Sequence, residues 1–431
     1  MQLRKINKEL GTAACALLQI PAAALHASSS EWEIDTAILY YAESDGRVSA
    51  VEPAIHAGKE LGSEQRIDLR LVVDVLTGAT PNGAHASSVL QTFTTPSGGS
   101  SYFAQPGETP LDDSFKDTRV AAGADWTLPI NRLSRIKLGL NGSTEYDYLS
   151  LGASATYLQD LNNRNTALTA GLAYNNDTVS PVGGVPVPLS PMQLPGETNR
   201  LGADDTKTVT DLILGITQVV SRKSRIQLNY VMGLQDGYMT DPYKIVAVVD
   251  PVTGLPDNTA LLNVNADALP YVYEKRPDTR QTNSIFFKTT HHFTRDVVYF
   301  SYRYFWDDWG ITSNTFDLKY RYEIGRGYLQ PHLRYYLQDA ADFYRHNLVQ
   351  GQDVDANGNV LLDTVSSDYR LAKLTTTTLG LKYGYALGDS SELSLRTEFM
   401  NQSVDDGDVP AGEETPDLDA IILNAAYSFR W

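Results

Sequence analysis

The sequence predicts an all-β protein, a transmembrane, antiparallel, up-and-down β-barrel of about 16 strands. Three observations predict this fold class. Short runs of the chain alternate apolar and polar residues. Among the connections between these runs, all the long ones have odd numbers in chain order. An export signal begins the chain, and a run of alternating apolar and polar residues ends it at an aromatic residue.

The first 27 residues are typical of a signal peptide. Positive charges at Arg4, Lys5 and Lys8 precede an apolar stretch from 11 to 20, and small residues follow as cleavage sites. The single cysteine, Cys15, lies inside this segment. A lipoprotein attachment there is disfavoured because apolar residues continue beyond it. We therefore expect residues 28–431 to form one barrel domain with long extracellular loops and no disulfide.

From Trp32 onward the chain consists of alternating runs, of which 32–43, 47–58 and 64–76 are the first. In the third run Ile67, Leu69 and Leu71 share one face with later valines, and charged residues occupy the other face. One face would suit lipid and the other a wet lumen. A soluble β-sandwich shows the same alternation, so periodicity alone leaves both folds open.

The lengths of the connections distinguish the two folds. Numbered along the chain, the even connections are short, and the long connections, near 77–114, 178–206, 238–277, 341–367 and 404–417, are all odd. In an up-and-down barrel the odd connections lie on one side, and outer-membrane barrels have short periplasmic turns and long external loops. The pattern favours that arrangement, with both termini in the periplasm.

The C-terminal residues resemble the closing-strand signal that outer-membrane barrels present to the barrel-insertion machinery. Apolar and polar residues alternate to the end of the chain, and the last residue is aromatic. We assign Tyr427, Phe429 and Trp431 to this signal. Together with the export signal, they indicate the outer membrane of a Gram-negative bacterium, where lipid and lipopolysaccharide would surround the protein.

Composition excludes one class of partner. The formal net charge is -17, whereas nucleic-acid binding needs a basic footprint. The 25 tyrosines suit a membrane–water interface, where one end of a side chain is apolar and the other is wet.

The predicted lumen face carries charges of both signs, which supports two interpretations. One is a selectivity lining for a charged solute, and the other is a ladder of ion pairs that stiffens a wet interior. Pairing is favoured because both signs occur on the same or neighbouring strands. The predicted lining consists of Arg66, Asp68, Arg70, Asp74, Arg303, Asp317, Lys319, Arg321, Glu323, Arg334, Arg396 and Glu398, and Arg430 also belongs to this face.

The segment 77–114 is long and rich in Gly, Pro, Ser and Thr, and a connection of this length in a compact domain is usually functional or disordered. We expect it to fold into the lumen as a plug, or to cap the outer mouth and meet a partner. Thr77 and Asn82 begin it, and both could bond to lumen arginines.

Other motifs favour structure over chemistry. Asp307, Asp308 and Trp309 indicate a turn at the barrel rim with an interfacial tryptophan, and the segment 353–359 indicates a hairpin rather than a calcium loop, because the acidic ligand at position twelve is replaced by Thr364. His291 and His292 are adjacent, so they point to opposite faces of a strand. We predict no catalytic residue, no metal site and no cofactor.

Three phrases resemble an uncharacterised bacterial family called domain of unknown function 3570. They run from Val73 to Ala84, from Ser143 to Tyr148 and from Ser301 to Gly310. The resemblance covers most of the mature chain and implies an outer-membrane barrel. It also implies an association with small cysteine-rich lipoproteins, thioredoxin-like proteins and flavin transferases, and hence with an envelope redox or export system.

Three functions follow as hypotheses. The first is a conduit or scaffold for a partner protein, such as a lipoprotein or a periplasmic protein held in or against the barrel. The second is a passive porin for small solutes, because about sixteen strands leave room for an aqueous channel. The third, an outer-membrane hydrolase, has only unassigned Ser, His and Asn residues to support it.

Overall fold

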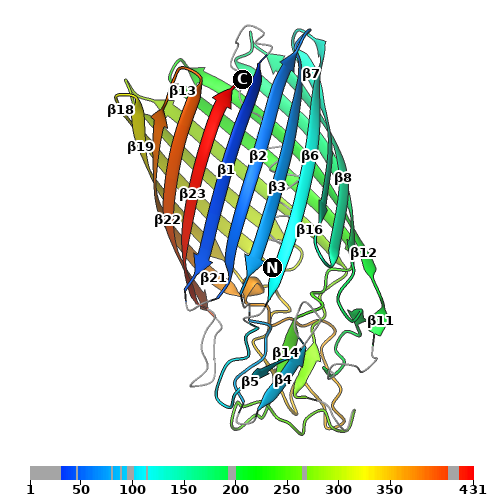
Figure 1. The fold of residues 1–431 in the computed structure, drawn as a ribbon. Helices are drawn as coiled ribbons and strands as arrows, with labels where there is room; N and C mark the ends of the chain where they lie inside the picture. The colour runs from blue at the N-terminus through cyan, green and yellow to red at the C-terminus, as the bar shows by residue number, and fades with distance from the viewer. Residues whose placement is uncertain are drawn as a thin grey trace.

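The computed structural model describes residues 31–431 except 45–46, 79–80, 88–89, 95–100, 113–114, 193–199, 265–268 and 406–416. Within this part of the chain, sixteen antiparallel strands close into a barrel, as the sequence predicts (Figure 1). The predicted signal peptide lies outside the described residues. The barrel strands are β1 (Trp32–Glu43), β2 (Ser49–Leu61), β3 (Gln65–Thr77), β6 (Lys116–Asn131), β7 (Ser134–Thr144), β8 (Tyr148–Leu161), β9 (Thr166–Val179), β12 (Asp205–Ser221), β13 (Ser224–Gly237), β16 (Thr279–His292), β17 (Val297–Asp307), β18 (Thr312–Ile324), β19 (Gly327–Gln338), β21 (Lys373–Ala386), β22 (Ser391–Asp405) and β23 (Leu418–Arg430).

Each barrel strand pairs with the barrel strand that follows it in sequence, and β23 returns to β1 to close the ring. At this closure Glu33 stands opposite Arg430. The backbone N–H of Trp32 donates to the carbonyl of Trp431 at 2.6 Å, and the N–H of Trp431 donates to the carbonyl of Trp32 at 2.8 Å. The barrel therefore has no free edge along its first strand.

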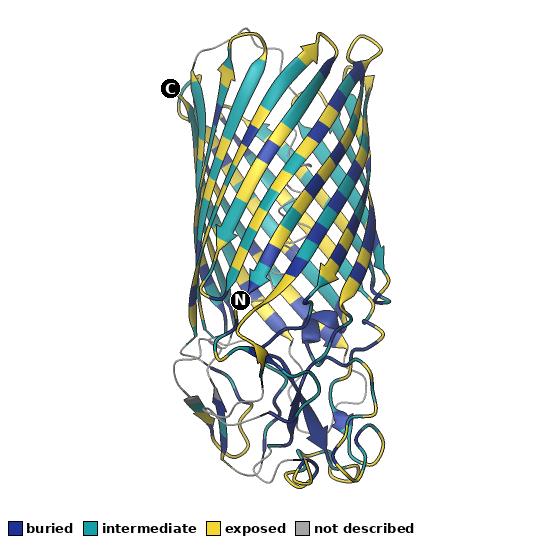
Figure 2. Cartoon of the chain, turned by 90° about the vertical axis from the view of Figure 1, so that its right-hand side faces the viewer, coloured by how far each residue is buried: buried dark blue, intermediate teal, exposed yellow. Residues whose placement is uncertain are grey.

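The apolar face of the strands points outward. On the inside of a closed barrel, side chains from strands on either side of a third strand approach each other. Arg66 of β3 reaches Glu33 of β1 at 3.0 Å, over Gly58 of β2. On the other face of β3, Leu69 and Leu71 remain 42% and 44% exposed. Figure 2 shows the alternation of exposed and less exposed residues along the strands. The inner face is thus polar, and the outer face carries the apolar side chains.

The connections are sorted as the sequence predicts. The even connections have two to four residues, and the long ones, 78–115, 180–204, 238–278, 339–372 and 406–417, are all odd. We call the two ends of the barrel the short-turn end and the long-loop end. The C-terminus lies at the short-turn end (Figure 1).

Four of the long connections fold together beyond the barrel into a unit that we call the cap, made of the described residues of 78–115, 180–204, 238–278 and 339–372. Figure 1 shows its strands at the end opposite the C-terminus. The cap contains the pairs β4–β5 (Gln91–Thr94, Ser101–Ala104) and β10–β11 (Val185–Pro186, Arg200–Gly202), a small sheet of β15 (Tyr271–Tyr273), β14 (Ile245–Val249) and β20 (Leu348–Val349), and the short 3₁₀ helix η1 (Tyr369–Leu371). No helix of the described residues is long and apolar enough to cross a membrane.

The cap has its own hydrophobic core. Val246, Val248, Val272 and Leu348 are fully buried, and Figure 2 shows the cap interior as buried. Val248 pairs with Leu348 in parallel although one hundred residues of chain separate them. Each such side chain stabilises the folded unit by about 1.5–3 kcal/mol. The long connections therefore form a folded unit rather than separate loops.

Two smaller predictions have opposite outcomes. The hairpin at 353–359 is confirmed, since Val354 and Val360 form an antiparallel bridge and Asp355 accepts the backbone N–H of Asn357 and Asn359 at 2.8 Å each. The rim turn at 308–311 is also present, but an interfacial Trp309 is wrong. Trp309 is 3% exposed and packs edge-on against Phe343, because connection 339–372 folds back over the barrel rim.

Candidate functional site at the mouth of the barrel

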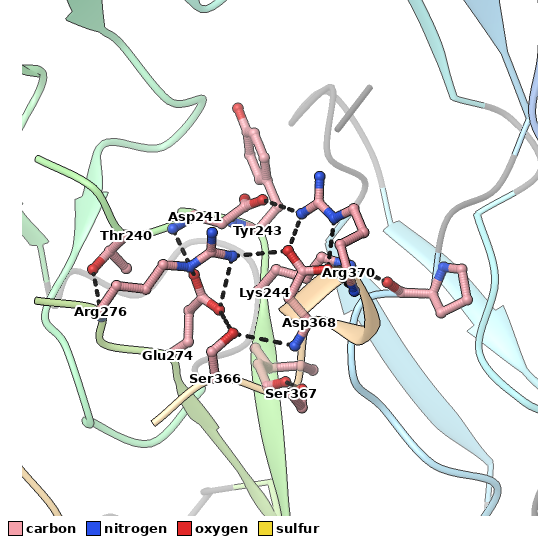
Figure 3. Close-up of polar contacts among 12 residues, drawn as sticks. Thr240, Asp241, Tyr243, Lys244, Glu274, Arg276, Ser366, Ser367, Asp368 and Arg370 are labelled. Atoms are coloured by element: carbon pink, nitrogen blue, oxygen red, sulfur yellow. Dashed lines mark hydrogen bonds and ion pairs between the residues drawn. The ribbon is translucent and has the colours of Figure 1, made fainter. Parts of the chain in front are cut away.

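The cap and the barrel mouth meet at a cluster of buried charges, drawn in Figure 3. Two long connections, 238–278 and 339–372, supply all of its charged members. We call this cluster the cap network. It consists of the cations Lys244, Arg276 and Arg370, the carboxylates Asp241, Glu274 and Asp368, and Ser366, all at most 8% exposed. The two signs balance, and each of the six charged side chains lies within 4.0 Å of one of opposite charge.

Asp368 is the centre of the cap network. Its Oδ1 accepts from Nε of Arg370 at 2.6 Å, and its Oδ2 accepts from Nη2 of Arg276 at 2.9 Å. Nζ of Lys244 lies 3.9 Å from Oδ1 of the same carboxylate. Its local geometry comes from the start of η1, where Asp368 is the N-cap and accepts the backbone N–H of Arg370. One fully buried carboxylate thus holds cations from both connections.

Glu274 joins the same connections at a second point. Its Oε1 accepts from Nε of Arg276 at 2.6 Å and from the backbone N–H of Asp241 at 2.7 Å. Its Oε2 accepts from the hydroxyl of Ser366, whose oxygen accepts the N–H of Asp368 at 3.1 Å. A backbone ladder between Lys275 and Val365, with both hydrogen bonds at 2.9 Å, fixes this register. The buried carboxylate is therefore fully hydrogen-bonded.

Burial and charge shift the pKa values of the cap network in different directions. Burial lowers the pKa of Lys244 below its ordinary value. Burial raises the pKa of Glu274, and Arg276 only partly opposes this rise. Burial alone would also raise the pKa of Asp368, but Arg370, Lys244 and Arg276 outweigh it and hold that pKa below its ordinary value. Asp368 is therefore ionised at neutral pH.

Contacts from other parts of the barrel rim reach the same cluster. Lys244 donates to the carbonyl of Pro81, in the connection between β3 and β6. The hydroxyl of Tyr243 donates to Oδ2 of Asp147, between β7 and β8, at 2.6 Å. The guanidinium of Arg47, between β1 and β2, lies 5.9 Å from the ring centre of Tyr369. Because these strand pairs are spread around the ring, the cap network lies across the mouth of the barrel.

The predicted lumen residues on β3 take part in ion pairs. Arg66 binds Asp68 at 2.9 Å as well as Glu33. Arg70 pairs with Asp125, and Arg119 binds Asp74 at 2.5 Å. His56 adds contacts of 3.2 Å to Asp35 and 3.1 Å to Asp68. On this side of the barrel the charges form a paired ladder.

The predicted lumen residues on β17 to β22 are paired less completely. Lys319 lies 3.3 Å from Asp317, Arg321 lies 2.5 Å from Glu323, and Arg396 lies 3.7 Å from Glu398. His332 bridges Asp317 and Glu398 at 2.7 Å each. The guanidinium of Arg303 lies 5.5 Å from the ring centre of Phe305. Arg334 has no carboxylate within 4.0 Å among the described residues.

The expected bonds of Thr77 and Asn82 to lumen arginines are wrong. Thr77 ends β3, and its hydroxyl bonds to that of Ser49 at 2.9 Å. Asn82 lies in the cap, where its side-chain amide donates to the hydroxyl of Tyr102 at 3.2 Å and its backbone carbonyl accepts the N–H of Ile245 at 2.9 Å. The described residues of this segment lie in the cap, beyond the strand ends, so the capping alternative holds over the plug. The reason is the apolar core of the cap, to which Ala84, Phe93 and Ala104 contribute.

The proposed C-terminal signal stays a prediction, although the structure locates its residues. The rings of Tyr427 and Phe429 stack at 5.2 Å, and Trp431 completes the closure against Trp32. Arg430 faces inward and lies 3.4 Å from Glu33.

The two adjacent histidines of β16 each make one hydrogen bond. His291 accepts or donates one hydrogen bond, to the hydroxyl of Ser224 at 2.9 Å, and His292 contacts the carbonyl of Phe293 at 2.6 Å. No carboxylate or amide orients His291 in this part of the chain. The described residues also contain no group of three or more His, Cys, Asp or Glu placed to hold a metal ion.

The cap network itself was not predicted from the sequence. One signal was present, since both long connections contain an acid two residues before an arginine, as Glu274 with Arg276 and Asp368 with Arg370. This spacing allows a local ion pair. It does not tell which connections meet.

Comparison with solved structures gives large barrels of low sequence identity. A bacterial polysaccharide outer membrane secretin has 9% identity and a TM-score of 0.43, with 93% of this chain and 99% of that chain covered. The CymD monoaromatic hydrocarbon channel has 9% identity and a TM-score of 0.41, with 98% and 93% covered. OccK5 (OpdH) of Pseudomonas aeruginosa has 9% identity and a TM-score of 0.41, with 93% and 98% covered. Similarities of this extent carry no information about function.

No curated protein matches the sequence. The profile of one family, described as "Protein of unknown function (DUF3570)", matches residues 7–429, which is nearly the whole chain. The resemblance seen in the three sequence phrases is thereby confirmed, and the chain belongs to this family.

Proposed function

We propose that this protein is an outer-membrane barrel that acts as a conduit or scaffold for a partner protein, which it receives from the periplasm. The outer face of the barrel supports the membrane location. Its apolar side chains are exposed on strands all around the ring, with Leu140 at 68%, Leu151 at 59% and Phe399 at 59% as examples. An exposed apolar band of this kind costs free energy in water and is stable in lipid.

The observation that carries the proposal is the folded cap over the long-loop end. A passive pore needs both mouths open, whereas the cap network ties the connections after β3, β13 and β19 to one another across this mouth. Breaking such a buried, fully paired cluster costs several kcal/mol, so the mouth does not open by thermal motion of single loops.

The other end of the barrel has a different character. The connections there have two to four residues, which are too short to cross the mouth of a barrel of sixteen strands. In outer-membrane barrels the short turns face the periplasm. A lumen that is capped at its extracellular end and bordered only by short turns at its periplasmic end suits a lipoprotein or a periplasmic protein as its partner. Membership of the family makes a redox or export system of the envelope the first place to look.

The proposal is tested by isolating the protein from native outer membranes with its bound partners. An affinity tag inserted after Val252, which is 90% exposed in a cap turn, avoids the C-terminal closure. We expect one periplasmic protein or lipoprotein in a stoichiometric amount, identified by mass spectrometry. Membranes with the untagged chain are the control. A barrel that is isolated alone under several mild detergents would refute the proposal.

A passive porin is the second candidate, because the inner face carries charged side chains on β1 to β3 and on β17 to β22. Single-channel conductance separates the two. The capped barrel is expected to conduct little in a planar bilayer, whereas a porin would show a large, steady conductance in the unmodified protein. The latter result would make the porin the preferred function.

A further inference from the structure

The charges on the inner wall are unevenly distributed. Along β13, β16, β19 and β21 the inward-facing residues include four cations without a carboxylate within 4.0 Å in the described part of the chain. Together with the paired Lys319, Arg321 and Arg396, they form what we call the basic wall. The four unpaired members are Arg225, Lys288, Arg334 and Lys382.

The register of the strands places the basic wall in one band. Lys288 is opposite Ser301, which is opposite Asp317, and Asp317 is opposite Arg334. Two inward-facing rows closer to the short-turn end, Lys382 is opposite Arg396. Arg321 and Lys382 lie 3.6 Å and 5.6 Å from the ring centre of Tyr328, which stands between them. The cations are therefore neighbours on one surface rather than isolated charges.

The basic wall reaches from the short-turn end into the middle of the barrel, where Arg334 is the eighth of the twelve residues of β19. Arg225 is the second residue of β13, and Lys288, Arg321 and Lys382 precede the ends of their strands at that end by three or four residues. A ligand that enters past the short turns reaches this band before it reaches the cap.

The wall across the lumen has the opposite character. β2 and β16 are second and tenth in the ring of sixteen strands, so they face each other. On β1 to β3 the carboxylates of Glu33, Asp35, Glu60 and Asp68 share the cations Arg66 and Arg430 with His56. Between an acidic and a basic wall the field points across the lumen, and an anionic ligand is held on one side.

We propose that the basic wall is the docking surface for an acidic peptide segment of the partner, which inserts into the lumen from the short-turn end. This inference rests on the proposed function and deepens it. Spacing favours an extended chain over a small anion. Strands are about 4.8 Å apart, so the cations from β13 to β21 span about 24 Å. An extended peptide of about eight residues covers this distance, whereas one small ion contacts only two or three of the cations.

The test uses the full-length protein purified in detergent and a fluorescein-labelled peptide of eight glutamates, with binding followed by fluorescence anisotropy. We expect binding that weakens as salt rises, because these are ion pairs in a wet lumen. The double variant R334E/K382E should bind at least about tenfold more weakly, and R334Q/K382Q should lie between it and the unmodified protein. A peptide of eight glutamines should not bind.

The matched control is R326E, which makes the same change of charge in the turn between β18 and β19, outside the basic wall. It should bind the peptide as the unmodified protein does. Each variant is first shown to be folded by the heat-dependent shift of its mobility in gel electrophoresis. Unchanged binding by R334E/K382E would overturn the inference, and the milder glutamine variant keeps the test valid if the double reversal does not fold.

Competition identifies the ligand class. Inorganic phosphate or citrate at the same concentration of negative charge should compete poorly, and polygalacturonate should bind no better than the peptide. Strong competition by the small anions, or tighter binding of the polysaccharide, would overturn the assignment to a peptide. The isolation experiment separates this inference from the proposed function. A partner that stays bound to R334E/K382E refutes the docking surface alone, whereas peptide binding without any isolated partner refutes the proposed function alone.

Discussion

The hydroxyl of Tyr243 in the cap donates a 2.6 Å hydrogen bond to Oδ2 of Asp147, in the turn between β7 and β8, and accepts the N–H of Val182 at 3.2 Å. One phenol thus ties the connection 238–278 to a different part of the rim. Y243F removes both bonds and leaves a buried carboxylate without this donor. We expect the cap to lose about 1.5–3 kcal/mol of local stability.

Hydrogen exchange measured by mass spectrometry checks this expectation. In Y243F, residues 180–190 and 238–250 should exchange faster than in the unmodified protein, and exchange in the barrel strands should not change. Y322F is the matched control, because Tyr322 is 51% exposed on the outer face. Equal protection in Y243F and Y322F would show that the tie does not hold the cap.

D368N should open the cap while the barrel stays folded. The substitution leaves Arg276, Arg370 and Lys244 buried around a neutral side chain, and breaking a buried pair costs about 3–5 kcal/mol. We expect rapid cleavage of the cap by trypsin and a higher conductance in planar bilayers. D355N is the control, since Asp355 lies in the exposed hairpin turn of the same cap. A D368N protein as resistant to trypsin as D355N would contradict the central role of Asp368.

Acid should open the cap only at low pH. The folded-state pKa of Asp368 lies below its ordinary value of 3.8, so its contribution is present above pH 3.8 and is lost as pH falls further. Glu274 has a folded-state pKa above its ordinary 4.5, so its protonation favours the folded cap as pH falls toward 4.5. We expect cap protection in hydrogen exchange to hold or rise slightly from pH 7 to 4.5 and to fall below 3.8. Opening between pH 6 and 5 would contradict this assignment.

Arginine on the outer face should impair assembly according to depth. Leu71 and Phe316 are 44% and 40% exposed on that face, well inside their strands, whereas Ile67 lies near the short-turn end of β3. L71R and F316R should each cost about 2–4 kcal/mol if the face meets lipid, and I67R less. The folded fraction in outer-membrane preparations measures this. N141R is the control and should assemble normally, because Asn141 is an exposed residue of the inner face, where it meets Asn175 over Gly152. Equal assembly of all four variants would argue against a lipid-facing surface.

The sequence predicts the barrel well because each strand carries its own signal. The alternation of Leu69 and Leu71 with Arg70 determines the face, and the order of short and long connections determines the topology, and both are local properties. The pairing of lumen charges was also foreseeable where partners share neighbouring strands, as for Arg70 and Asp125.

The cap network was beyond such reasoning because its contacts are long-range. Arg276 and Asp368 are separated by 92 residues, and nothing near either residue specifies the other. Trp309 illustrates the same limit. Its position after a strand predicts an interface, but its burial depends on Phe343 of the next long connection. Which connections pack together is decided by the curvature of the closed sheet and by apolar residues far apart in the chain.

The order in which the molecule can form follows from the cap. Lys244 contacts both Pro81 and Asp368, yet the three residues lie in connections that leave the barrel after its third, ninth and thirteenth strands. They come within reach only once the ring has curved shut, because in a flat or partly zipped ribbon these strands are tens of ångströms apart. Resistance of the cap to protease is therefore acquired last during biogenesis, and its appearance in a time course marks the molecules that have finished inserting.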